Sequence, residues 1–163
     1  MKRNLLIILT VLLCSACGNK VQSEKLHFTQ NGFSIAPLEE ATKSDTPYQA
    51  LMMYLPFSDN FAPNVNVQMK PHTGTIEDYI KQNKELLEKG NLKMIKEDRI
   101  GDDTYAFEYT GSFRDLSVHL YTRSVLSSGR VYVVTAGAME SQWEKYSGKL
   151  KNCVDSFELD KSK

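Results

Sequence analysis

The sequence has few cysteines, no excess of charge of either sign and no long hydrophobic run. Only 3 cysteines occur in 163 residues, and 20 lysines and arginines are matched by 20 aspartates and glutamates. This balance argues against a general nucleic-acid-binding protein, which carries an excess of basic residues. The hydrophobic content of 41% is too high for a disordered chain. These values predict one globular domain with a packed core.

Motifs of common enzymes are missing as well. The sequence contains no G-x-S-x-G, no H-E-x-x-H, no phosphate loop and no dinucleotide fingerprint. His119 and Ser117 are two residues apart on an expected strand, so their side chains lie about 7 Å apart, too far for serine activation. Asp102 and Asp103 follow Gly101, which is typical of a turn, with a hard-cation site as the alternative. We expect no enzymatic activity, no catalytic residue, no metal site and no cofactor.

The chain does have an apolar leader. Lys2 and Arg3 precede the run Leu5–Leu13, which is interrupted only by Thr10. This order is the layout of a secretory signal peptide. A transmembrane helix needs about 20 apolar residues, and this run is shorter. A leader that is removed on export is therefore expected.

The end of the leader resembles the bacterial lipobox, in which small residues precede a cysteine that receives diacylglycerol. The matching stretch is Leu13-Cys14-Ser15-Ala16-Cys17-Gly18, although Cys14 stands where Leu or Val is usual. We expect residues 1–16 to be a lipoprotein signal peptide and Cys17 to be lipidated. Ordinary cleavage after Ala16, giving a soluble exported protein, is the alternative.

Several acyl chains on one residue hold a protein on a bilayer far more firmly than a single chain does. Residues 17–25 are polar and are expected to form the lipidated tether. The residue after Cys17 is Gly18, not the Asp that signals retention in the inner membrane. We expect a protein anchored in the bacterial cell envelope, on the outer membrane facing the periplasm if the cell has two membranes.

Cys153 has no cysteine partner once Cys14 leaves with the leader and Cys17 is acylated. The mature chain is therefore expected to form no internal disulfide. Cys153 falls on the apolar stripe of an expected helix, so we interpret it as a buried hydrophobic residue, with a reactive thiol as the alternative.

Residues 26–159 are expected to form one domain, followed by a tail at 160–163. The expected strands are Leu26–Thr29, Phe33–Ile35, Gln49–Leu55, Asn64–Lys70, Leu92–Arg99, Thr104–Thr110, Leu116–Leu126 and Arg130–Ala136. Asn31-Gly32 favours a type I′ hairpin turn, and Pro37–Pro47 is expected to be a loop. Short connections predict antiparallel neighbours. Val131–Ala136 is apolar on both faces, which indicates a central strand covered on both sides.

Two helices are expected, at Ile76–Lys89 and at about Gln142–Ser156. Thr75 is placed to cap the first and Gly90 to end it. Ser141 and Glu144 have capping-box spacing at the start of the second. The apolar face expected on the first helix consists of Ile76, Tyr79, Ile80, Leu86 and Leu87.

These elements resemble the PsbP-like superfamily, which includes the photosystem II extrinsic protein, Ran-binding Mog-type proteins and small bacterial envelope proteins of the DcrB kind. The stretches that carry the resemblance are Ile76–Asn83, Tyr105–Tyr109, Tyr132–Ala136, Trp143–Tyr146 and Val154–Phe157. The resemblance implies an α+β fold, an α/β/α sandwich around a largely antiparallel sheet with two main helices. It brings no catalytic motif with it.

The segment Pro56–Pro63 carries Phe57 and Phe61 between prolines. Such side chains either fold back onto the core or face outward, and exposed aromatic residues mark interaction surfaces. We expect a non-enzymatic envelope protein that docks to another envelope protein, with these two residues as the partner-binding candidates. A binding module for a small apolar or lipid-like ligand, held between sheet and helix, is the alternative. Met52 and Met53 are expected to pack in a strand, or to line such a pocket.

Overall fold

The computed structural model describes residues 24–44 and 49–160. The leader, Cys17 and residues 161–163 of the expected tail lie outside these residues. Ten strands and two helices follow one another along the described chain. The strands of the main sheet are β3 (Thr42–Ser44), β4 (Leu51–Tyr54), β5 (Asn64–Pro71), β6 (Leu92–Gly101), β7 (Thr104–Phe113), β8 (Leu116–Ser127) and β9 (Arg130–Met139).

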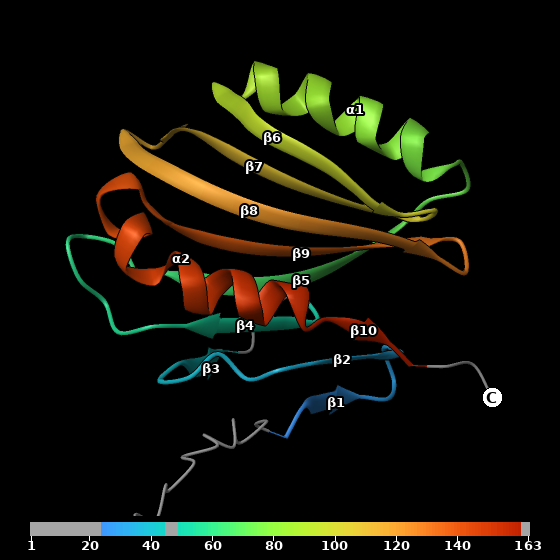
Figure 1. Cartoon of the computed structure of the whole chain (residues 1–163), viewed down its shortest axis with the longest axis horizontal. Coiled ribbons are helices and arrows are strands. Elements are labelled where there is room, and N and C mark those ends of the chain that lie inside the picture. The colour runs from blue at the N-terminus through green and yellow to red at the C-terminus, as the bar shows by residue number, and fades with distance from the viewer. Residues whose placement is uncertain (1–23, 45–48, 161–163) are drawn as a thin grey trace, which may run out of the picture.

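The main sheet has the order β3-β4-β5-β9-β8-β7-β6, and all its pairings are antiparallel (Figure 1). Short connections join β6 to β9 into a meander, as expected from the sequence. The segment 37–47, expected to be a loop, contributes the short edge strand β3. Its residues Thr42–Ser44 are polar, and β3 forms because its backbone pairs with β4 at the edge of the sheet.

A second sheet of three short strands lies beside the main one. It consists of β1 (Leu26–Phe28), β2 (Phe33–Ile35) and β10 (Glu158–Leu159), in the order β1-β2-β10. The expected hairpin is present, but its turn is not type I′. Phe28 pairs with Phe33, the N–H groups of Asn31 and Gly32 both donate to the carbonyl of Phe28, and only Gly32 has a positive φ. The turn spans residues 29–32, which gives a longer loop than the dipeptide predicts.

One helix covers each face of the main sheet, which gives the expected α/β/α arrangement. Helix α1 (Ile76–Lys89) lies along the β6 side, and α2 (Glu140–Asp155) crosses the opposite face next to the small sheet (Figure 1). The larger core is under α2 and includes Phe33, Val134 and Phe157. The smaller core is under α1 and includes Ile76, Ile80, Phe107, Tyr109 and Val131. Strand β9 contributes to both cores, as its two apolar faces predict.

The first helix begins as the sequence predicts. Thr75 accepts a hydrogen bond from the Asp78 N–H, and the Asp78 carboxylate accepts one from the Thr75 N–H. Gly90 ends the helix. Leu86, expected on the buried face, is instead 65% exposed. Helix α1 lies at the margin of the sheet, so only its first half contacts enough sheet to be buried.

The second helix begins two residues earlier than predicted, at Glu140. The chain passes directly from β9 into α2, and the Met139 N–H donates to Oε1 of Gln142 at 3.2 Å. The expected capping box of Ser141 and Glu144 is therefore wrong. Gln142 takes its place because it is the side chain that reaches back to the first free N–H group of the helix.

Strand β6 is one outer edge of the main sheet. Its pairing with β7 shifts in register between Met94 and Lys96 and again between Arg99 and Gly101. Ile95, at the first shift, is 54% exposed. An irregular, charged edge is a common way to prevent pairing with another chain.

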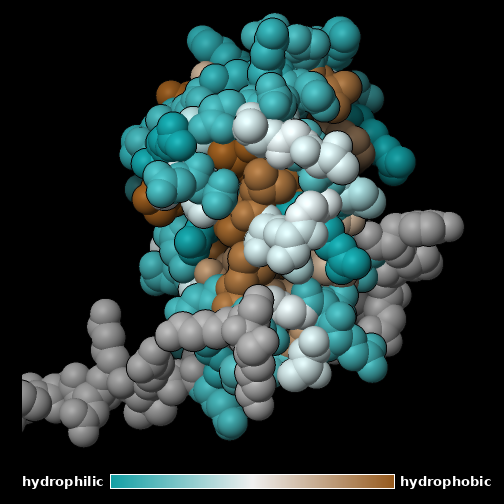
Figure 2. Space-filling view, turned by 90° about the vertical axis from the view of Figure 1, so that its right-hand side faces the viewer, coloured by the Kyte–Doolittle hydropathy of each residue, from teal (hydrophilic) through white to brown (hydrophobic). Residues whose placement is uncertain are grey.

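Figure 2 shows the end of the molecule that carries the β8–β9 hairpin. Hydrophobic residues form a stripe down the middle of this view, and hydrophilic residues lie on both sides of it. Hydrophobic side chains therefore reach the surface at this end of the molecule. Within residues 24–44 and 49–160, no helix is long and apolar enough to cross a membrane.

Candidate functional site

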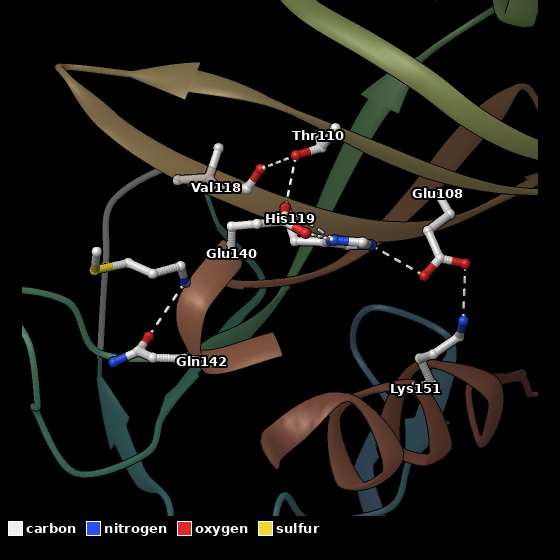
Figure 3. Close-up of polar contacts among 8 residues, drawn as sticks. Glu108, Thr110, Val118, His119, Glu140, Gln142 and Lys151 are labelled. Atoms are coloured by element: carbon white, nitrogen blue, oxygen red, sulfur yellow. Dashed lines mark hydrogen bonds and ion pairs between the residues drawn. The ribbon is translucent and has the colours of Figure 1, made fainter. Parts of the chain in front are cut away.

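A group of connected charged side chains lies where the start of α2 meets β7 and β8 (Figure 3). His119 projects from β8 toward α2, with Glu108 from β7 on one side and Glu140, the first residue of α2, on the other. Lys151 completes the group from a position three turns further along the same helix. We call these four residues the His119 cluster.

Both ring nitrogens of His119 face carboxylate oxygens. Nε2 lies 3.0 Å from Oε1 of Glu108, and Nδ1 lies 3.1 Å from Oε2 and 3.2 Å from Oε1 of Glu140. Oε2 of Glu108 accepts a hydrogen bond from Lys151 at 2.9 Å, and Oε2 of Glu140 accepts one from Thr110 at 2.7 Å. A doubly protonated imidazole, which has two N–H groups, is the form that donates to both glutamates.

Packing holds the imidazole in one orientation. His119 is only 7% exposed, and its ring stacks on the indole of Trp143 with centroids 4.0 Å apart. Lys151 also lies over the ring of Tyr121 at 4.8 Å, and the Tyr121 hydroxyl donates to Oδ1 of Asp155 at 2.7 Å. Burial, and then the hydrogen bond to Asp155, raise the pKa of Tyr121.

The two glutamates are held in their charged forms. Burial acts to raise the pKa of Glu108, but hydrogen bonds and charge from Lys151 and His119 outweigh it, so the pKa lies below its ordinary value. The hydrogen bond from Thr110 lowers the pKa of Glu140, and contact with His119 adds to this effect. The cluster is therefore an ionic link between α2 and the sheet.

This geometry does not activate a nucleophile. Ser117, the hydroxyl weighed as a partner for His119, is exposed, and both nitrogens of the imidazole are directed to carboxylates. The ring nitrogens also point in opposite directions, so the two glutamates do not converge on a common centre (Figure 3). In the described part of the chain no group of three or more histidine, cysteine, aspartate or glutamate side chains is arranged to hold a metal ion.

The loop with the two candidate phenylalanines is a tight hairpin. Ser58 and Phe61 exchange backbone hydrogen bonds of 3.0 Å in both directions, and the positive φ angles of Asp59 and Asn60 match a type I′ turn. Phe57 is 71% exposed, whereas Phe61 is half-buried. The structure thus separates the two: Phe57 faces outward and Phe61 partly packs on the molecule.

Gln142 fixes this hairpin to α2. Its Nε2 donates to the Ser58 carbonyl at 2.8 Å and lies 3.0 Å from the Ser58 hydroxyl, while its Oε1 accepts from Met139. The Gln142 residue is only 4% exposed. Residues 56–63, called the Phe57 loop below, are therefore positioned by the same first turn of α2 that contacts His119.

Other residues considered from the sequence have structural positions. Cys153 is 3% exposed, and burial raises the pKa of its thiol to about 12, which agrees with a buried hydrophobic residue. Met52 and Met53 are buried on β4, as expected for strand residues. Asp102 and Asp103 form the turn between β6 and β7. The expected lipidation site, Cys17, lies outside the described residues.

Sequence reasoning weighed His119 only as a partner for Ser117 and set it aside, and it missed the neighbours Glu108, Glu140 and Lys151. One signal was available for Glu108. A two-residue turn at Arg114-Asp115 sets the register of β7 on β8, and this register puts Glu108 and His119 on the same face. Gly111–Asp115 was instead expected to be the connection. The contact with α2 is tertiary, and periodicity within single elements does not predict it.

A shallow cleft of about 310 Å³ lies between the end of α1 and the start of β6. Its lining is half apolar and half charged: Leu87, Leu92, Met94, Lys84, Glu88 and Lys93. This cleft lies between sheet and helix, as expected for the alternative of a small apolar or lipid-like ligand. Its volume is at the lower end of the range for small-molecule sites.

Solved structures with the same fold come from several groups of bacteria. The cyanobacterial PsbP protein CyanoP from Synechocystis superposes with a TM-score of 0.61 at 15% identity, covering 90% of this chain and 98% of that one. LpqN of Mycobacterium tuberculosis, described as involved in cell envelope biogenesis, gives 0.61 at 11% identity over 88% and 93%. A putative regulator from Pseudomonas aeruginosa gives 0.61 at 12% identity over 86% and 98%.

Sequence comparison points the same way. PsbP-like protein 1 of Arabidopsis thaliana chloroplasts is 36% identical over 59 residues, which are 36% of this chain and 26% of that protein. The match thus spans about a quarter of the length of this relative. The PsbP family profile matches residues 60–159, from the Phe57 loop to the end of the second sheet. With most of its length matched by that profile and its fold shared with CyanoP, the chain belongs to the PsbP family.

Proposed function

We propose that this chain is a lipid-anchored, non-enzymatic accessory protein of the bacterial cell envelope that docks to another envelope protein through the Phe57 loop. The observation that carries the proposal is Phe57, 71% exposed at the end of a hairpin that Gln142 fixes in place. A large apolar side chain held rigidly in solvent costs little further ordering when a partner binds it. The expected partner presents an apolar pocket for one aromatic ring.

Membership of the PsbP family favours an accessory or binding role, and the LpqN neighbour supports a place in the cell envelope. The His119 cluster supports a non-enzymatic role, because its ring nitrogens are occupied by Glu108 and Glu140. The anchor rests on the lipobox-like stretch that ends at Cys17.

The docking surface is tested by site-specific photo-crosslinking of the full lipidated chain in cells. A photoreactive residue at position 57 or 61 is expected to capture the same single envelope protein. Position 113 is the matched control, because Phe113 is also an exposed aromatic on a hairpin, at 58%. No adduct from positions 57 and 61, or the same adduct from position 113, would show that the Phe57 loop is not a docking site.

The anchor is tested separately with Cys17→Ser. The variant is expected to leave the membrane fraction and to lack the mass of the acyl chains by mass spectrometry. A variant that stays on the membrane with unchanged mass would contradict lipidation at Cys17.

The cleft between α1 and β6 favours a second function, the binding of a small anionic amphiphile. Leu87, Leu92 and Met94 would contact its chain, and Lys93 would contact its head group, since Lys84 already pairs with Glu97. Native mass spectrometry of the detergent-extracted protein would show a retained lipid in that case. A Leu87→Asp variant is expected to lose it, and retention by this variant would exclude the cleft as the binding site.

A further inference from the structure

We propose that the His119 cluster is a proton-dependent clasp that controls how firmly the Phe57 loop is held, an inference that rests on the proposed docking function of that loop. The clasp is closed when the imidazole is doubly protonated and weakens when it loses one proton. The docking surface is then held most firmly when both ring nitrogens carry a proton. Three contacts link the His119 ring to the Phe57 loop.

The first contact is the imidazole with its two glutamates. A neutral imidazole has one N–H group and one lone pair, so one of the two carboxylates at 3.0–3.2 Å then faces a lone pair. Side-chain exposure decides which contact is lost. Glu108 is 15% exposed and Glu140 is 49% exposed, so water replaces a lost imidazole donor less readily at Glu108, which keeps only Lys151 on its other oxygen. The Nε2–Glu108 hydrogen bond is therefore retained, and the Nδ1–Glu140 contact is lost.

The charges around the ring act in the same direction. Lys151 on α2 neutralises Glu108 directly, and the more distant Lys96 on β6 also interacts with it. Among the described residues no lysine or arginine pairs with Glu140, which keeps the Thr110 hydroxyl on β7 as a donor. On β8, Tyr121 bonds to Asp155 of α2 and contacts Lys151 rather than Glu140. Loss of the imidazole charge is thus felt mainly at Glu140.

The second and third contacts lead from Glu140 to the loop. Glu140 is the first residue of α2, and Gln142 in the same turn accepts from the Met139 N–H. Gln142 also donates to the carbonyl of Ser58, which anchors the hairpin below Phe57. When Glu140 is released, the first turn of α2 loses its ionic tie to the sheet, and the position of Gln142 is fixed less firmly. The Phe57 loop then opens more often.

The state of the ring is measured in the isolated protein by the fluorescence of Trp143. This is the only tryptophan of the sequence, and it stacks directly on His119. A protonated imidazole in ring contact quenches indole emission more than a neutral one does. Between pH 5 and 9 the emission is expected to rise in one step. The step is expected in His27→Gln and His72→Gln, which remove the two other histidines, and to be absent in His119→Gln.

The response of the loop is measured by hydrogen exchange at the amides of Ser58 and Phe61, corrected for the intrinsic effect of pH. Their protection is expected to fall by about fivefold or more across the same pH interval, the lower end of typical coupling between linked sites. Gln142→Ala is expected to keep the fluorescence step and to lose the pH response of the loop.

Two results would overturn the proposal. A flat Trp143 emission between pH 5 and 9 would show that the ring does not titrate. Unchanged protection of Ser58 and Phe61 across the fluorescence step would show that the ring does not control the loop. Both measurements can be made on the wild-type protein alone, so the proposal can still be tested if His119→Gln does not fold. Both measurements use the isolated protein without a partner. A clasp that fails is therefore distinguished from a docking site that fails, which only the crosslinking experiment reports.

Discussion

Glu108 is a single residue on which two opposite effects compete. Burial disfavours its charge, whereas Lys151 and His119 bond to both of its oxygens, and the net result is a lowered pKa. A residue of this kind stabilises the folded state only while it is ionised. The same holds for Glu140, whose pKa is also lowered.

The pH dependence of stability follows from these two glutamates. Their folded pKa values lie below the ordinary value of 4.5, so they stabilise the fold above that pH, and the contribution is lost as the pH falls through the folded values. Glu108→Gln is therefore expected to lower the melting temperature at pH 7 and to flatten its decline below pH 4.5. Thermal denaturation from pH 7 to 3 measures both effects. The control is Glu144→Gln, an exposed position on the same helix, and an equal change there would contradict the assignment.

Cys153 gives a second prediction at the scale of a residue. The thiol donates to the Ala36 carbonyl at 3.3 Å, and burial raises its pKa to about 12. Because the thiolate is the reactive form, alkylation at pH 8 is expected to be slow in the folded protein and fast in urea. Peptide mass spectrometry after iodoacetamide treatment locates the label at Cys153. Rapid labelling of the folded protein would contradict this burial.

Among the secondary-structure elements, two glycines have opposite roles. A Cβ at Gly111 on β7 would clash with the Asn91 carbonyl and lie 3.0 Å from the Leu92 Cα, both of them backbone atoms at the start of the neighbouring strand β6. A Cβ at Gly148 on α2 would meet nothing within 4 Å. One glycine therefore allows a close approach of two strands, and the other only weakens a helix.

The pair Gly111→Ala and Gly148→Ala tests this difference. Gly111→Ala is expected to destabilise the protein by more than about 2 kcal/mol, because backbone must move to admit the methyl group. Gly148→Ala is expected to stabilise it by about 1 kcal/mol, the difference in helix propensity. Urea denaturation of both variants gives the two values. A Gly111→Ala protein as stable as wild type would mean that β6 and β7 are not this close.

The sequence predicts the long elements well because their patterns are local. The capped α1 and the meander from β6 to β9 were predicted, since Thr75, Gly90 and the short turns are visible in the chain. Strands β3 and β10 were not, because each is fixed by pairing with a partner distant in sequence. Likewise the spacing of Ser117 and His119 argues against a catalytic pair, but the contact of His119 with Glu140 depends on how α2 packs on the sheet.

For the whole molecule, the larger core joins the two ends of the described chain. Phe33 near the start packs against Phe157 near the end, with ring centroids 5.2 Å apart, and Tyr132 of β9 contacts both. Strand β10 then pairs with β2. The small sheet thus joins the two ends of the described chain, because β10 pairs with β2. We call this contact the closure.

Removing one ring of this closure affects the entire fold. Phe157 is 1% exposed, so Phe157→Ala is expected to destabilise the protein by about 3–5 kcal/mol and to make the β1–β2 hairpin sensitive to protease. Phe113→Ala, at a 58% exposed position, is expected to change stability by less than about 0.5 kcal/mol. Denaturation and limited proteolysis compare the two. Equal losses would show that Phe157 does not hold the closure.

The irregular edge strand β6 would affect how neighbouring copies interact if many of them were anchored in one bilayer. Neighbours confined to two dimensions collide at their sides far more often than freely diffusing molecules do. A straight, apolar edge strand would let adjacent copies pair through their backbones into one continuous intermolecular sheet. The two register shifts and the lysines of β6 interrupt that template and so disfavour edge-to-edge pairing between copies.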